Sequence, residues 1–375
     1  MREFDVAILG AGIAGASLGF RLAEGRSVVV LERESQPGYH ATGRSAAMFM
    51  QSYGPPAVRA LTRASREFYA HPPDGFVQEQ LLAPRGVLYL ATHGQEALLQ
   101  QTGATLRATC PDLELLPADA ALARVGCLRP EVVHGALFER DAQDIDVHAL
   151  HQGFLRGLRR QGGELRIGVQ LERAQRNGSW WELRLAGGEA LRARAVANAA
   201  GAWADEVAAL FGAASIGLVP HRRSAFTFKA PEGLDASGWP AVVGVDESYY
   251  FKPDAGQLLG SPANADPTVP HDVVPEELDV ATGIHQIESV TTLTIRRPTS
   301  TWAGLRSFVR DGEMVIGWDD ACPGFFWLAG QGGYGIQSAA AASELAASLL
   351  RGEPLPGALA QHGVDPQALS VKRLR

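Results

Sequence analysis

The chain has 375 residues, of which 46% are hydrophobic and 20% charged, a balance that is ordinary for a globular protein. This length exceeds one simple hydrophobic core and predicts two domains, or one domain with a large insertion. The net charge of −7 at pH 7, and arginines that are scattered or paired rather than arrayed on one stripe, argue against a nucleic-acid-binding protein.

No segment approaches the roughly 20 unbroken apolar residues of a membrane span. The apolar stretch 6–20 follows Glu3 and Asp5 and contains four glycines, which is unlike a signal peptide. We therefore expect a cytoplasmic protein without an integral membrane segment. Cysteine use fits a reducing compartment, because the three cysteines are far apart and form no CxxC pair: Cys110, Cys127 and Cys322.

The first predicted unit is β-α-β and spans residues 5–32, from the apolar run "DVAIL" to "SVVVLE". Gly10, Gly12 and Gly15 between them match G-x-G-x-x-G, which lets the chain turn, lets its backbone approach a pyrophosphate and lets helix and strand pack closely. Glu32 ends the second strand, where a carboxylate accepts hydrogen bonds from a ribose diol. The pattern predicts a dinucleotide site but does not distinguish NAD from FAD.

Three later segments favour FAD over NAD. Glu32 is followed by a long Gly/Ser/Thr loop rather than by a helix, and two further glycine turns, 198–201 and 330–335, each follow an apolar strand and open a helix. The N-terminus of a helix suits the negative charge that a reduced flavin carries at its pyrimidine end.

Long strings, including "DIDVHALHQGFLRG", "NAAGAW", "TWAGLRSF" and "GFFWLAGQGGYGIQ", resemble the D-amino-acid oxidase/dehydrogenase superfamily. Within it they are most similar to the soluble bacterial FAD-dependent D-arginine dehydrogenases. The resemblance covers nearly the whole chain. It implies oxidation of an amino acid at Cα.

The resemblance also implies an α/β fold in which a Rossmann-type FAD-binding domain is interleaved with a mixed-sheet α+β substrate domain. We expect the FAD-binding domain to comprise residues 1–54, 145–215 and 301–375. The substrate-binding domain would comprise residues 55–144 and 216–300.

The cofactor is expected to bind without a covalent bond. Some relatives attach flavin through a cysteine just after the arginine of "GLR", where this chain has Ser307 and Phe308. Positions that match the cofactor contacts of the family are Gly10, Gly12, Ala14, Gly15, Glu32, Arg33, Arg44, Ser45, Ala46, Ala47, Gly201, Trp203, Gly332, Gly333, Tyr334, Gly335, Ile336 and Gln337.

A carboxylate is best held by a guanidinium fork, and the resemblance selects Arg223 and Arg306 for that role. Composition alone would not choose between Arg222 and Arg223. Tyr53 and Tyr250 match aromatic hydroxyls that contact the carboxylate or amine of the substrate. Without the resemblance, Tyr250 would be read as a core-facing strand tyrosine.

The segment "GRSAAMFMQSYG" holds two of the four methionines and matches a mobile lid over the substrate. D-Arginine dehydrogenase has polar residues at the positions of Met48, Met50 and Val87. At the position of Val87 it has a glutamate, which holds the cationic side chain of its substrate. An apolar pocket here predicts hydrophobic rather than cationic D-amino acids, unless the methionines only pack the lid. Gly333 and Gln337 match positions beside the substrate amine.

These residues include no obvious general base, and none is required if the amine binds neutral. We therefore expect oxidative deamination: the imino acid is released and hydrolysed to a 2-oxo acid and ammonia. His148 and His151 on one helix could be metal ligands, but a helix capped by Asp146 beneath the FAD domain explains them. No metal is expected.

Alternatives remain open. On the same fold the substrate could be an N-methyl amino acid, glycine or a 2-hydroxy acid. Outside it, the chain could be an NAD(P) reductase or a non-catalytic flavoprotein subunit. We expect a dehydrogenase with a quinone-type or other acceptor rather than oxygen.

Overall fold

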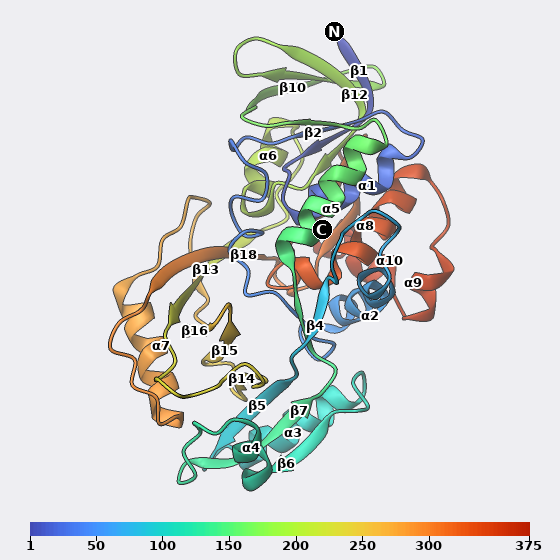
Figure 1. Cartoon of the computed structure of the whole chain (residues 1–375). Helices are drawn as coiled ribbons and strands as arrows, with labels where there is room; N and C mark the ends of the chain where they lie inside the picture. The colour runs from blue at the N-terminus through green and yellow to red at the C-terminus, as the bar shows by residue number, and fades with distance from the viewer.

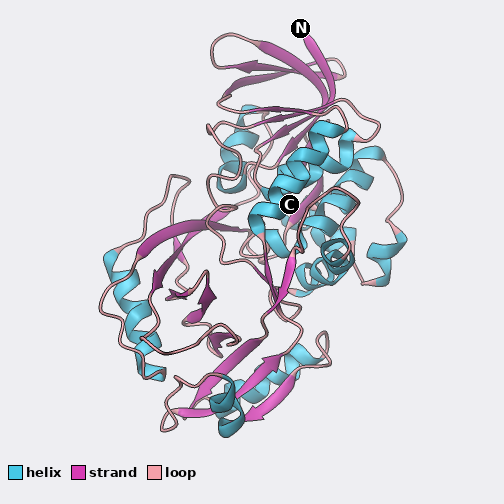
Figure 2. Ribbon diagram, in the orientation of Figure 1, coloured by secondary structure: helices cyan, strands magenta, loops and turns pink.

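The computed structural model describes all 375 residues and contains two large sheets, one small sheet and the helices between them (Figures 1 and 2). The first large sheet has eight strands. Its centre is parallel, in the order β9-β2-β1-β12-β20, and antiparallel strands flank it. The bounds are β1 Arg2–Leu9, β2 Val28–Leu31, β9 Glu164–Arg166, β10 Leu171–Asn177, β11 Trp180–Leu185, β12 Ala190–Asn198, β19 Val315–Trp318 and β20 Phe325–Ala329.

Alternate residues of the central strands pack into two different cores, one on each face of the sheet. Val6 and Ile8 belong to a core shared with α1 (Ile13–Ala23), α2 (Pro56–Ala70) and α8 (Gly335–Arg351). Ala7 and Leu9 belong to the opposite core, with the short helix α6 (Ala204–Leu210). Successive side chains of a strand point to opposite faces, so strands buried on both sides are apolar throughout. This is the predicted α/β architecture.

The second large sheet is mixed and has nine strands, eight of them in the order β17-β13-β16-β15-β14-β5-β7-β6, with β18 on the other edge of β13. The bounds are β5 Val87–Thr92, β6 Glu114–Pro117, β7 Val133–Glu139, β13 Val219–Phe228, β14 Ala241–Gly244, β15 Tyr250–Asp254, β16 Gln257–Ser261, β17 Asp266–Pro267 and β18 Ser300–Phe308.

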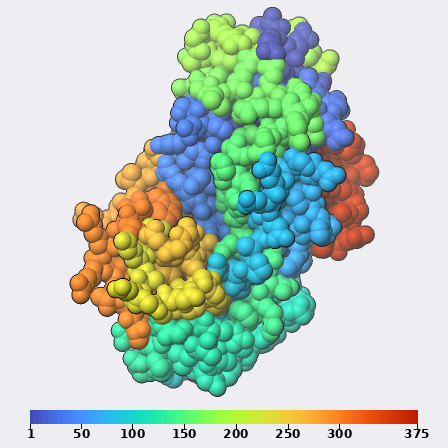
Figure 3. All heavy atoms as spheres, viewed as in Figure 1, coloured from blue at the N-terminus to red at the C-terminus, as the bar shows by residue number.

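Helices α3 (Glu96–Arg107), α4 (Ala118–Arg124) and α7 (Glu277–Val290) pack on this sheet. In the space-filling view the teal residues near 90–140 form the lower end of the molecule, with yellow and orange residues beside them (Figure 3).

The short strands β3 (Met48–Phe49), β4 (Leu82–Pro84) and β8 (Gln143–Ile145) form a three-stranded sheet. Met48 and Phe49, in the segment that matches a lid, are thereby paired with β8. Helix α5 (Val147–Arg160) follows, and the Asp146 carboxylate caps it by accepting a hydrogen bond from Ala149 N at 2.8 Å. The chain ends in α9 (Gly357–Gln361), α10 (Pro366–Leu369) and η2 (Val371–Leu374).

Two segments pack differently from the predicted domain boundaries. Strand β18, expected in the FAD-binding domain, pairs with β13 along its whole length and so belongs to the second sheet. Helix α2, expected in the substrate domain, shares the core of the first sheet with α8. In both cases contacts with residues distant in the sequence determine to which domain the segment belongs. Domain boundaries drawn along the sequence do not take such contacts into account.

Candidate active site

The first glycine turn connects β1 to α1 at the carboxyl end of the eight-stranded sheet. Gly10 has φ +99°, and a Cβ there would lie 2.6 Å from the carbonyl oxygen of Ala199. A Cβ at Gly15 would lie 1.9 Å from the carbonyl oxygen of Gly10, so α1 packs against the turn only without a side chain there. These contacts fit the turning and packing roles predicted for the first and third glycines.

Glu32 holds this turn from the end of β2. Its carboxylate accepts hydrogen bonds from Ala11 N at 2.7 Å and from Glu34 N at 2.9 Å. From the other side, Thr42 Oγ1 accepts from Ile13 N at 2.9 Å and so caps a free N–H at the start of α1. Thr42 stands in "HATGRS", a string that does not by itself indicate a helix cap.

Aromatic and cationic groups lie next to Glu32. The Arg33 guanidinium lies 4.2 Å from the centre of the Trp203 ring, and the His40 ring lies 4.6 Å from it. His40 also contacts Glu34 at 2.9 Å, and this hydrogen bond lowers the pKa of the Glu34 carboxyl. Arg33 and Trp203 are among the predicted cofactor contacts, whereas His40 is not.

Arg44 joins the loop after β2 to the segment between β17 and α7. It donates to the carbonyl oxygens of Val273 at 2.9 Å and Ala303 at 3.0 Å and pairs with Asp272. Trp302 Nε1 donates to the Arg44 carbonyl oxygen at 3.1 Å. The Arg44 guanidinium is thus engaged by protein groups.

A cavity of about 590 Å³ runs from the Glu32 end of the first sheet to β13 and β18 of the second. Most residues predicted to contact a cofactor line it: Gly10, Gly12, Ala14, Glu32, Arg33, Arg44, Ser45, Ala46, Gly201, Trp203, Gly332, Gly333, Gly335 and Ile336. Four others do not: Gly15, Ala47, Tyr334 and Gln337.

The third glycine turn meets two predicted substrate residues at one end of this cavity. Gly332 N donates to the carbonyl oxygen of Ser307 at 2.9 Å. A Cβ at Gly333 would lie 2.9 Å from Arg306 Nη1 and 3.0 Å from Tyr53 Oη. Only glycine therefore lets the turn pass so close to these two side chains, and α8 begins directly after it.

Strand register places Arg223 and Arg306 on one face of the β13–β18 pair. Arg306 lies opposite His221, two residues from Arg223, and residues two apart on a strand share a face. Both arginines line the cavity, as does Tyr250 from β15. Arg222 is not among its lining residues and pairs with Asp279, at 2.9 Å, and with Glu276.

Neither Arg223 nor Arg306 forms a salt bridge. Arg223 Nε donates to the carbonyl oxygen of Asn264 at 2.5 Å, and Arg306 Nη1 donates to Tyr53 Oη at 2.8 Å. Burial, and then the neighbouring charge of Arg306, lower the pKa of Arg223 to about 10. Arg223 is still protonated at neutral pH, so this end of the cavity attracts an anion.

The residues predicted to contact the substrate side chain lie beside the lined cavity. Met50 and Val87 are 8% and 0% exposed and share an apolar cluster with Tyr89, against which Met48 and Tyr53 pack. None of these five residues is among those that line the cavity.

A buried carboxylate that the sequence did not predict as a site residue lies in this region. Glu139 is 2% exposed and stands opposite Val87 in the β5–β7 pair, so their side chains share a face. Its carboxylate accepts from Gln51 N at 2.7 Å and from Ser52 Oγ, whose oxygen lies 2.6 Å from the Tyr89 phenol. Burial raises the pKa of Glu139. A lone acid ending the apolar run "GALFE" was the available signal.

Gln337 connects the same segment to two helices. Its side-chain oxygen accepts from Met50 N at 3.3 Å, and its amide nitrogen donates to Thr62 Oγ1 at 2.9 Å and to the Tyr53 carbonyl oxygen at 3.3 Å. Its contacts position residues 50–53. His151 on α5 contacts the Ala11 carbonyl oxygen at 2.8 Å, and burial lowers its pKa.

Comparisons with known proteins identify the family and the fold. The family model described as "DAO: FAD dependent oxidoreductase" matches residues 5–349. Glycine oxidase from Geobacillus kaustophilus is 23% identical, with a TM-score of 0.85 over 100% of this chain and 99% of that chain. Iminodiacetate oxidase from Chelativorans sp. BNC1 is 23% identical, with a TM-score of 0.81 over 97% and 98%.

A third similar structure, L-alpha-glycerophosphate oxidase from Mycoplasma pneumoniae with FAD bound, is 16% identical, with a TM-score of 0.80 over 94% of this chain and 95% of that chain. The chain belongs to the DAO family of FAD-dependent oxidoreductases. Its cofactor is FAD. No helix is both long and apolar enough to cross a membrane.

The residues present fit this cofactor. Gly10 and Gly12 place no side chain between the cavity and the backbone at the N-terminus of α1, so that a pyrophosphate can approach it closely. Glu32 faces the same cavity and offers carboxylate oxygens to a ribose. The glycine turn before α8 supplies a second helix N-terminus beside Arg306, at the opposite end of the cavity.

Proposed function

We propose that the protein is a dehydrogenase of D-amino acids that prefers apolar side chains. The observation that carries this proposal is the pair Arg223 and Arg306, which lines the FAD cavity without a carboxylate partner. A substrate carboxylate would supply the missing negative charge, and a guanidinium fork binds it in a fixed orientation.

Around the arginine pair, the residues that line the cavity can orient the substrate, and neither His221, which lies opposite Arg306, nor Glu247 is among them. Tyr250 lines the cavity there, and Tyr53 holds Arg306 in place. Bound FAD would supply the acceptor for a hydride from the substrate Cα. A neutral amine needs no base for this step, and the released imino acid hydrolyses to a 2-oxo acid and ammonia.

The proposed preference for apolar side chains requires the substrate side chain to reach the cluster of Met48, Met50 and Val87, which lies outside the lined cavity. Placing a guanidinium or ammonium there without a counter-charge would cost several kcal/mol in desolvation, whereas burial of apolar surface contributes about 25 cal/mol per Å². The nearby carboxylate of Glu139 is already occupied by Gln51 and Ser52. The preference for D-enantiomers rests on the resemblance to D-arginine dehydrogenases.

A second candidate is oxidation of glycine or an N-substituted amino acid. The full burial of Val87 and the near burial of Met50 favour it, because they leave these side chains outside the lined cavity. Two structurally similar proteins carry the names glycine oxidase and iminodiacetate oxidase. A 2-hydroxy acid would use the same arginine pair.

We further propose a quinone-type or other acceptor rather than oxygen, following the same resemblance. The three cysteines are free and buried, which supports action in the cytoplasm.

Anaerobic mixing of the FAD-loaded protein with amino acids tests these proposals through the loss of visible flavin absorbance. The panel is D-leucine, D-methionine, D-phenylalanine, D-arginine, L-leucine, glycine and N-methylglycine. We expect fast bleaching by the apolar D-amino acids and slow bleaching by D-arginine. Comparable rates for D-arginine and D-leucine would refute the apolar preference, and comparable rates for both leucines would refute the D-preference. Bleaching by glycine or N-methylglycine alone would establish the second candidate. Admitting air afterwards distinguishes an oxidase, whose flavin colour returns quickly, from a dehydrogenase.

A further inference from the structure

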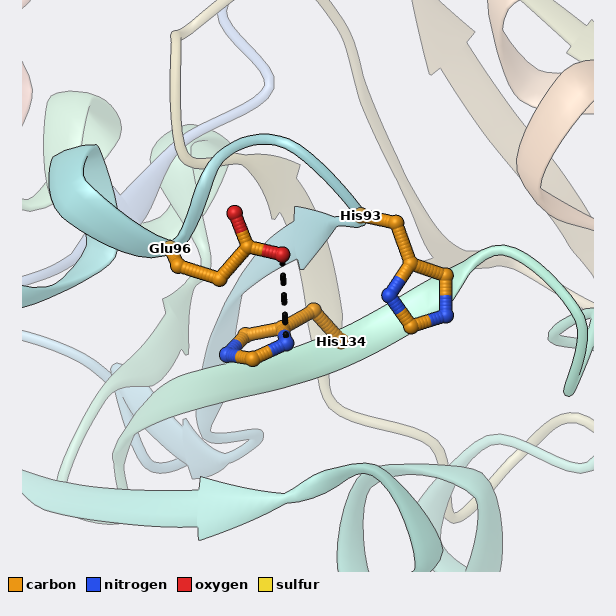
Figure 4. Close-up of side chains that lie close together, drawn as sticks. All are labelled: His93, Glu96 and His134. Atoms are coloured by element: carbon orange, nitrogen blue, oxygen red, sulfur yellow. Dashed lines mark ion pairs between the residues drawn. The ribbon is translucent and has the colours of Figure 1, made fainter.

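Three potential metal ligands meet at the surface of the second sheet, outside the FAD cavity. His93 follows β5, Glu96 begins α3, and His134 lies in β7 (Figure 4). One ligand atom from each lies within 4.8 Å of the others, and His134 Nδ1 lies 3.5 Å from Glu96 Oε1. None of the three lines the FAD cavity.

The types of ligand match a first-row divalent cation. Two imidazoles and one carboxylate leave coordination positions for water, an arrangement found for zinc and for related transition metals. Ligands of a tetrahedral zinc ion at about 2.0–2.1 Å stand roughly 3.4 Å from one another. The His134–Glu96 separation already matches this value, and His93 is exposed, so that its ring can rotate toward the other two.

The backbone around these side chains is held in place by hydrogen bonds. His93 N donates to the Val132 carbonyl oxygen at 3.0 Å, which joins the end of β5 to the start of β7. Gly94 has φ +93° and donates its N–H to Glu96 Oε1 at 3.0 Å, which fixes the direction of the Glu96 carboxylate. A metal would thus meet an anionic oxygen on a defined turn.

The same turn contacts the strand pair that carries Tyr250. Gln95 accepts from Thr92 N at 3.0 Å, and its amide donates to Asp246 Oδ2 at 3.0 Å, just before β15. An ion held by His93 and Glu96 would therefore stabilise the turn that supports the Asp246 segment.

We propose that His93, Glu96 and His134 form a binding site for a first-row divalent cation, with zinc as the best match. The site is independent of the oxidation reaction. His93 and Glu96 are three residues apart, but His134 is distant in the sequence and joins them only when β5 and β7 pair, which is why spacing rules did not identify the site.

Calorimetric titration of the FAD-loaded protein with zinc chloride tests the proposal, and cobalt absorption reports on the coordination. We expect one equivalent to bind, and each of the variants His93→Ala, Glu96→Gln and His134→Ala to weaken binding at least tenfold. His71→Ala, which removes an exposed histidine elsewhere, should bind as the unmodified protein does. The flavin spectrum and circular dichroism report whether each variant is folded. Absence of binding, or equal binding by all folded variants, would overturn the proposal.

Discussion

Arg306 Nη1 donates a 2.8 Å hydrogen bond to Tyr53 Oη, which joins β18 to the segment that follows β3. The donor is a cation in the wall of the FAD cavity, and the acceptor has no charge of its own. The contact leaves the positive charge of Arg306 available to a substrate while fixing the direction of its guanidinium.

Tyr53→Phe removes the acceptor and leaves a half-buried N–H of Arg306 without its protein partner. A hydrogen bond to a charged group contributes about 1.5 kcal/mol or more, so we expect kcat/KM for D-leucine to fall about tenfold or more. Steady-state kinetics with an artificial electron acceptor measure this. Tyr249→Phe is the matched control, because the Tyr249 hydroxyl is buried without a partner and its loss should leave kcat/KM unchanged. Equal effects of the two changes would contradict the assignment.

Binding of a carboxylate should weaken as the pH rises through about 10. Burial and the neighbouring Arg306 lower the pKa of Arg223 to about 10, so Arg223 loses its positive charge above that pH in the free protein. The compound to use is 4-methylpentanoate, which lacks the amine of leucine and therefore does not titrate in this range. Its inhibition constant should increase above pH 10. In Arg223→Ala the constant should be higher at pH 8 and stay flat as the pH rises through 10. A persistent rise in this variant would assign the titration to another group.

Glu139 should act as a positioning residue for Tyr53. Glu139→Ala removes the acceptor of Gln51 N and Ser52 Oγ, so the segment that carries Tyr53 loses its attachment to β7. We expect KM for D-leucine to rise about tenfold, with a smaller change in kcat, because hydrogen bonds to a charged group contribute about 1.5–3 kcal/mol.

Glu139→Gln keeps one acceptor oxygen and should recover part of the affinity. A purely structural role would instead lower thermal stability in both variants without changing KM.

FAD should be released from the protein by acid denaturation. All three cysteines are buried, and none lines the cavity. Ser307 stands just after Arg306, where some relatives have the cysteine that attaches flavin. After precipitation with acid we expect the yellow colour in the supernatant. Colour that stays in the pellet would show a covalent bond.

Local sequence patterns predicted the strands, helix and turn of the nucleotide site, because the residues that form it are close together in the sequence. Gly10, Gly15 and Glu32 lie within one β-α-β unit, where strand period and glycine spacing fix the geometry. Thr42 and Glu139 act on segments distant in sequence, Thr42 on α1 and Glu139 on residues 51–52, so their partners emerge only in the folded chain.

The choice between Arg222 and Arg223 also could not be made from local sequence patterns. Alternation on β13 separates Arg222 from Arg223, but it does not say which of them faces the cavity. The structure distinguishes them through Asp279, which pairs with Arg222 from α7. Likewise, the pairing of β18 with β13 moves residues 300–308 to the second sheet, although the chain continues from there into the first.

Val87→Glu should destabilise the protein rather than create a binding site for a cationic side chain. Val87 is fully buried and shares a strand face with Glu139, so the new acid would lie beside a buried carboxylate. Burial without a partner and repulsion between like charges should together lower the free energy of unfolding by about 3 kcal/mol.

The double variant Val87→Glu/Glu139→Gln removes the repulsion but not the burial. We therefore expect it to be more stable than the sum of the two single changes predicts, by about 1 kcal/mol. Urea unfolding of all four proteins measures this coupling, and Val87→Gln controls for the burial of a polar group without charge. Additive effects would show that the two carboxylates do not interact. A stable Val87→Glu with high kcat/KM for D-arginine would instead show that position 87 reaches the substrate.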